Sequence, residues 1–231
     1  MRYLSLLIVA LLFSCKNERV IQLPEIENAD IKEVLDVSPA YVFYDQTQPD
    51  STLFNRKNLI STTNWLVNVD KRLTLKQAIP HLQYLQNKRR KASMHKNENA
   101  KNYFTSNDTS IKNLGFLEFT DVNYIEEEST HFYLKTSQLY LNKTFLHLRI
   151  NSNKKVNFIR IGKDKNLKNK IIRYSDLNNY LIKIKKESKN LLVVCLNFNK
   201  ELIFQDYISI KSELSKLNID EIIIDGNEFF Y

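Results

Sequence analysis

The sequence predicts an α+β protein built of small mixed sheets with helices on one face. Short segments rich in aromatic and β-branched residues alternate with segments whose apolar residues recur at helical spacing. The second half of the chain shows this alternation most clearly, in the order β-β-α-β-α-β. Only three of the 231 residues are glycine, which excludes glycine-rich phosphate-binding loops and the nucleophile elbow of hydrolases.

The N-terminus has the pattern of a signal peptide. Arg2 precedes an apolar run over residues 6–13, which is well short of the roughly 20 residues that a membrane-spanning helix needs. The run ends in Leu12-Phe13-Ser14-Cys15, which resembles the lipobox of bacterial lipoproteins. The resemblance implies cleavage between Ser14 and Cys15, and acylation of Cys15 with palmitate and related chains. The alternative interpretation of Cys15 is a buried cysteine at the end of an N-terminal helix.

A lipidated Cys15 predicts where the protein acts and what it meets. Two acyl chains give stable anchoring, so we expect an exported protein held on the cell envelope, with the outer membrane favoured over the inner one. The periplasmic and surface faces both stay open. The formal net charge is +8, but export argues against nucleic acid as the partner. Lipid headgroups, acidic protein faces and anionic wall polymers remain.

Five segments are expected along the chain. Residues 1–14 form the signal peptide, and the polar residues 15–35 form a tether without sustained apolar periodicity. Residues 36–125 form a first α+β domain, and residues 138–231 form a second. Between them lies a linker over residues 126–137, which begins with an acidic run interpreted as a solvated loop.

The first domain is expected to contain strands at residues 40–44, 65–69 and 116–119. Thr74 and Gln77 have the spacing of a capping box and start a helix, in which Pro80 predicts either a kink or a later start. The polar residues 95–108 are expected to form a loop. The helix ends in the densest basic cluster of the chain, Lys88, Arg89, Arg90 and Lys91. This cluster is either stabilised by the helix dipole or forms a binding surface for an anionic partner.

The second domain is expected to begin with strands at residues 146–150 and 156–161. A helix capped by Ser175, a buried strand at residues 191–196, a helix over residues 207–217 and a strand at residues 221–225 follow. Cys195 lies in the buried strand and is expected to belong to the core rather than to act as a nucleophile.

This order resembles the periplasmic domain of the ExbD/TolR family over residues 139–231. The resemblance is carried by the strand at residues 194–197, the helix that ends at Leu217, and the run Ile222-Ile223-Ile224. It implies a domain that forms homodimers and contacts envelope partners or cell wall. The membrane helix and aspartate of that family's proton-driven members have no counterpart, so the motor function is not implied. The first half is either a degenerate copy, with residues 75–85 and 103–114 as its two helices, or an unrelated α–β alternation.

No catalytic constellation is visible in the sequence. The four histidines lie far apart, and both His81 and His147 are expected on solvent-exposed polar faces. We therefore predict no catalytic residues, no metal and no cofactor. The expected function is a lipid-anchored binding or scaffolding protein that docks an envelope protein or a wall polymer. The alternative is an envelope hydrolase acting on wall or glycan substrates.

Overall fold

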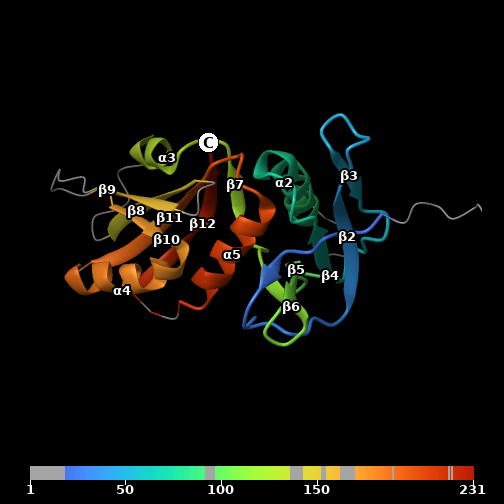
Figure 1. Cartoon of the computed structure of the whole chain (residues 1–231), viewed down its shortest axis with the longest axis horizontal. Helices are drawn as coiled ribbons and strands as arrows, with labels where there is room; N and C mark the ends of the chain where they lie inside the picture. Colours follow the sequence, from blue (N-terminus) through green and yellow to red (C-terminus); the bar gives the residue numbers. More distant parts are fainter. Residues whose placement is uncertain are drawn as a thin grey trace, which may run out of the picture.

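The computed structural model describes residues 19–91, 97–135, 143–151, 155–161, 170–188, 190–217, 219 and 221–231. Two six-stranded sheets lie side by side, with helix α5 between them (Figure 1). The predicted α+β class is confirmed. Cys15 and the signal peptide lie outside the described residues. Within the described residues, no helix has the length and apolar character needed to cross a membrane.

The first sheet has the order β1-β5-β4-β2-β3, with β6 paired to β5. Its strands are β1 (Glu25–Ile26), β2 (Val37–Tyr44), β3 (Thr52–Asn55), β4 (Asn64–Val69), β5 (Asn102–Asp108) and β6 (Asn113–Glu118). Strands β1, β5, β4 and β2 are parallel to their neighbours in this order, whereas β3 and β6 pair antiparallel. Helix α2 (Leu75–Lys91) connects β4 to β5 and packs its apolar side on the sheet. This sheet carries a parallel crossover as well as antiparallel pairs, as a mixed sheet should.

Helix α2 starts where its capping box predicts. The amide of Thr74 donates to Oε1 of Gln77 over 2.8 Å, and the helix begins at Leu75. Pro80 lies inside the helix without delaying its start. The capping box therefore decides the helix start, because it satisfies a backbone donor that the first turn leaves without an intrahelical partner.

The polar residues predicted as a loop form strand β5 instead. Asn102 is fully buried and accepts a hydrogen bond from Arg89, while its own amide group donates to Gln86. Phe104 stacks on Phe119 with ring centroids 3.8 Å apart. Residues 103–114, a helix in the interpretation as a repeat, are strand, turn and strand, so the degenerate copy is not confirmed.

The segment predicted as a tether is hydrogen-bonded to the first sheet. The carbonyl of Gln22 accepts from the Lys71 amide over 2.8 Å, and β1 pairs with β5. The amide of Ala29 donates to Oδ2 of Asp108 over 2.7 Å. Hydrogen bonds from Ser110 and from this amide lower the pKa of Asp108 to about 2. The segment thus covers an edge of β5 that would otherwise be open, unlike the extended tether predicted from composition.

The second sheet has the order β10-β9-β8-β11-β12-β7. Its strands are β7 (Asn123–Ile125), β8 (Lys143–Ile150), β9 (Lys155–Ile161), β10 (Lys170–Arg173), β11 (Leu191–Phe198) and β12 (Ile222–Phe230). Its helices are α3 (Ser129–Lys135), α4 (Leu177–Glu187) and α5 (Phe204–Ser215). Strand β10 is additional to the predicted order β-β-α-β-α-β. Ser175 lies in a short 3-10 turn before α4 and does not cap that helix.

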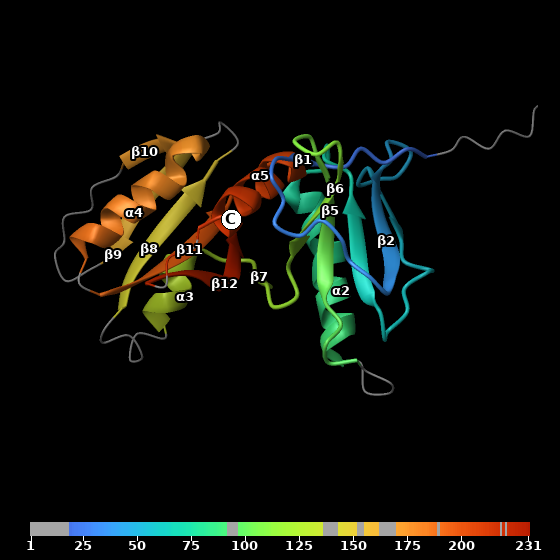
Figure 2. The same cartoon turned by 90° about the horizontal axis from the view of Figure 1, so that it is seen from below.

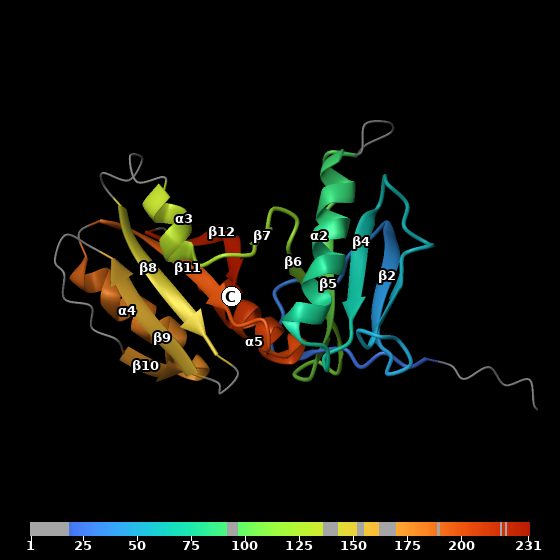
Figure 3. The ribbon, with the colours of Figure 1, turned by 90° about the horizontal axis from the view of Figure 1, so that it is seen from above.

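Helices cover both faces of the second sheet, not one face as predicted. Helices α4 and α3 lie on opposite sides of it (Figures 2 and 3). Along β11, Leu192, Val194 and Leu196 belong to the main core, whereas Val193 and Cys195 pack with Phe229 and the residues of α3. Because β11 is apolar on both sides, each of its faces needs a cover.

The two sheets share one hydrophobic core. Strand β7, which belongs to the predicted first domain, pairs with β12 of the second sheet. The ring of Phe104 lies 5.4 Å from that of Phe204 and 6.0 Å from that of Tyr207, between the two sheets. The predicted linker contains α3, and its acidic run is ion-paired rather than solvated: Glu126, Glu127 and Glu128 bind Lys200, Lys135 and Arg149. The predicted boundary therefore separates segments that pack together.

Candidate binding groove

The predicted basic cluster does not form one binding surface, because Arg89 is buried. Its guanidinium donates to Oδ1 of Asn102 over 3.0 Å and to the carbonyl oxygens of Ser61 and Thr63 over 3.1 and 3.0 Å. It also lies 3.8 Å from the centre of the Trp65 ring. Burial lowers the pKa of Arg89 to about 10, so the side chain stays charged at neutral pH. Arg89 joins the end of α2 to the sheet.

The other three members of the cluster are exposed. Arg90 donates to the carbonyl of Val122 over 2.9 Å, and the ammonium of Lys88 lies 5.9 Å from the centre of the Trp65 ring. Lys91 ends the helix. These positions suit cations at a helix C-terminus, with Arg89 as a structural residue that periodicity alone did not distinguish.

His147 is buried, in contrast to the predicted solvent exposure. Helix α3 covers its face of the sheet, so the side chain is only 1% exposed, and its Nδ1 lies 2.6 Å from Oγ of Ser129. Burial lowers the pKa of His147 to about 4. His81 is half-buried, with Nε2 3.1 Å from Oγ1 of Thr52, and burial lowers its pKa as well. Both histidines are held by hydroxyl groups rather than by solvent.

Cys195 lies fully buried in β11, as predicted. Burial raises the pKa of its thiol, so the reactive thiolate is disfavoured. Among the described residues, no three His, Cys, Asp or Glu side chains are arranged to hold a metal ion. His131 is exposed, and His95 lies outside the described residues.

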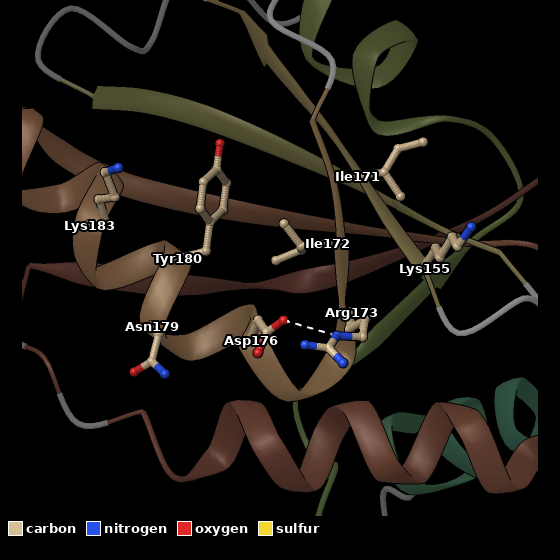
Figure 4. Close-up of a pocket in the computed structure, with 8 residues that line it drawn as sticks. All are labelled: Lys155, Ile171, Ile172, Arg173, Asp176, Asn179, Tyr180 and Lys183. Atoms are coloured by element: carbon tan, nitrogen blue, oxygen red, sulfur yellow. Dashed lines mark hydrogen bonds and ion pairs between the residues drawn. The ribbon is translucent and has the colours of Figure 1, made fainter.

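The most open concave site of the second sheet is a groove of about 530 Å³ between β10 and α4 (Figure 4). We call it the β10/α4 groove. It is lined by Lys155, Ile171, Ile172, Arg173, Asp176, Asn179, Tyr180 and Lys183. Sequence reasoning missed it, because β10 was not predicted and the lining residues come from separate elements.

The rim of the groove is basic. Three cations, Lys155, Arg173 and Lys183, face a single carboxylate, that of Asp176. Asp176 pairs with Arg173 over 3.3 Å, but the two side chains are 50% and 81% exposed, so this pair is weak. Within the described part of the chain, Lys155 and Lys183 have no ion-pair partner. The groove thus has a surplus of positive charge.

Two of these cations lie directly across from each other. Arg173 of β10 is the register partner of Lys155 of β9. Like charges at opposite positions of an antiparallel pair disfavour the pairing. An anion between the two side chains would remove this repulsion, which makes this end of the groove suited to a carboxylate or a phosphate.

The floor of the groove is apolar. The Tyr180 ring packs edge-on against Phe158 with centroids 4.5 Å apart, and burial raises the pKa of its hydroxyl. Ile172 is half-buried beside it, whereas Ile171 is 59% exposed. An apolar floor with a cationic rim suits a ligand that has both apolar and anionic groups.

A second groove tests the hydrolase alternative. It has a volume of about 310 Å³, lies between β1 and α5, and is lined by three carboxylates, those of Glu25, Glu27 and Glu213. Glu25 pairs with Lys71 over 2.6 Å and Glu213 with Lys216 over 2.7 Å, and their side chains are 53% and 42% exposed. A glycosidase needs one carboxyl group whose surroundings keep it protonated. Exposed, lysine-paired carboxylates do not provide such surroundings.

No family model matches the chain, and neither a curated protein nor a solved structure gives a match. The lipobox and ExbD/TolR resemblances therefore rest on the residues that carry them.

Proposed function

We propose that the protein is a lipid-anchored binding or scaffolding protein of the cell envelope that docks an anionic partner in the β10/α4 groove. The partner is an acidic envelope protein or a wall polymer. The observation that carries this proposal is the open groove with an apolar floor and three cations on its rim. Such a site binds without needing a catalytic group.

The geometry of the chain supports a role at a membrane surface. In the proposal, Cys15 carries the acyl chains, and Gln22 is already hydrogen-bonded to the first sheet. Seven residues span at most about 25 Å when extended. The first sheet is thereby held close to the bilayer, while β10 and α4 lie at the opposite end of the molecule from β2 and β3 (Figure 1). The groove is then presented to neighbours in the same layer, where confinement raises effective concentration.

The docking proposal can be tested by crosslinking in cells followed by mass spectrometry. We would compare the parent with a variant that carries Lys155→Gln, Arg173→Gln and Lys183→Gln. The matched control changes three exposed lysines elsewhere, Lys57, Lys143 and Lys186, to glutamine, and so removes the same charge. A partner captured by the parent and the control but not by the groove variant supports the proposal. Equal capture by all three proteins contradicts it, and degradation of wall material by the purified protein supports the hydrolase instead.

The anchor is tested separately by metabolic labelling with an alkyne palmitate. Cys15→Ala should abolish the label and leave the precursor unprocessed, because the acylated thiol is missing. Equal label on the variant and the parent would contradict the lipoprotein assignment.

A further inference from the structure

We propose that the occupant of the β10/α4 groove is an extended acidic peptide segment that adds to β10 as a further strand. This inference rests on the proposed function and specifies the class of partner. It is carried by the coincidence of an open strand edge, an apolar floor and a cationic rim in one groove.

The first step concerns the backbone. Strand β10 ends the order of the second sheet, and among the described strands it pairs with β9 alone. An edge strand presents N–H and C=O groups that are free to pair with another chain. Peptides that add to such an edge gain affinity from these main-chain hydrogen bonds. A polysaccharide offers no matching ladder of amides, so the backbone favours a peptide over a glycan.

The second step concerns the side chains. Lys155 and Arg173 lie at one end of the groove and Lys183 at the other, with Ile172 and Tyr180 between them (Figure 4). Alternate side chains of an extended segment point to the same face and repeat about every 7 Å. Acidic side chains near the ends of a short strand can therefore meet the cations, while apolar ones between them contact the floor.

The third step concerns the occupants that the charges disfavour. A second copy paired edge to edge would bring its own Lys155 and Arg173 towards the same cations, and like charges oppose such pairing. The acidic run of this chain is also unsuited, because Glu126, Glu127 and Glu128 already bind lysine or arginine side chains. A separate acidic partner is the occupant that complements the rim.

The test uses the full-length protein in non-ionic detergent and fluorescence anisotropy of labelled eight-residue peptides. The probe alternates glutamate and valine. One comparator replaces two central valines by proline, which keeps the charge but removes donors from the ladder. The other comparator alternates lysine and valine. The glutamate–valine peptide should bind at least tenfold more tightly than either comparator, and binding should weaken with added salt.

Variants of the protein then locate the site. Lys155→Gln combined with Arg173→Gln removes two exposed charge contacts and should weaken binding about 2- to 30-fold. The control Lys57→Gln combined with Lys186→Gln removes the same charge and should leave binding unchanged. Amide hydrogen exchange should slow in β10 when the peptide is bound, and thermal unfolding of each variant should match that of the parent.

The outcomes separate this inference from the proposed function. If the proline peptide binds as tightly as the probe and the groove variant weakens both, the groove takes anions without strand addition, and only the inference fails. If no acidic peptide binds while the groove variant still abolishes crosslinking in cells, the partner is not a strand-forming peptide, and again only the inference fails. If edge-to-edge dimers form instead, the charge argument is wrong. If peptide binding and crosslinking are both unaffected by the groove variant, both proposals fail.

Discussion

Replacing Arg89 by methionine tests whether the basic cluster of α2 is structural. The substitution removes two fully buried hydrogen bonds, to Oδ1 of Asn102 and to the carbonyl of Thr63, and the guanidinium contact with Trp65. A buried acceptor left without a partner costs about 1–3 kcal/mol, and a cation–π contact contributes about 0.5–2 kcal/mol. We therefore expect the free energy of unfolding to fall by about 3–5 kcal/mol. That is a large part of the roughly 5–15 kcal/mol of a typical domain.

Urea denaturation of the purified protein measures this loss. Lys91→Met is the matched control, since it makes the same chemical change at an exposed position of the same helix end and should stay within about 0.5 kcal/mol of the parent. Arg89→Lys keeps the charge near the helix C-terminus but loses the forked geometry, so it should also be destabilised. A loss below about 1 kcal/mol for Arg89→Met would refute the structural assignment. Full stability of Arg89→Lys would leave only the helix-dipole explanation.

Three further predictions follow from the shared core, from His147 and from Gly115. A fragment of residues 138–231 lacks β7, α3 and the Phe104 contact, so its thermal unfolding by circular dichroism should lack a cooperative transition; a sharp one would show that the sheets fold independently. Burial lowers the pKa of His147 from 6.5 to about 4, so the unfolded chain takes up this proton first: the stability that His147 contributes is full above pH 6.5 and falls by about 3 kcal/mol as the pH drops to 4. His147→Asn should flatten this part of the stability–pH profile, and an unchanged slope would assign it to other groups. Gly115→Ala would place a Cβ 2.6 Å from that of Ala29, so it should destabilise the packed N-terminal segment by about 1–3 kcal/mol and speed its proteolysis, whereas unchanged proteolysis would contradict the close packing.

The candidate groove shows why sequence periodicity reached the fold class but not the site. Lys155, Arg173 and Lys183 lie on three separate elements, and no spacing in the sequence relates them. Strand β10 has four residues, too few for a periodic signal. The only cluster that is contiguous in sequence, at the end of α2, contains the buried Arg89. Contiguity in sequence therefore indicated the wrong basic surface.

The sequence by itself determined those features that depend on neighbouring residues. The capping box fixed the start of α2, and alternating or continuous apolar residues located β2, β4, β8 and β11. Only the tertiary structure decided the features that depend on distant partners. Strand β5 forms because β4, β6 and the side chains of α2 satisfy its polar residues, and His147 is buried because α3 covers its face of the sheet. The burial of a polar residue depends on which groups meet it in space, and local sequence carries little information about that meeting.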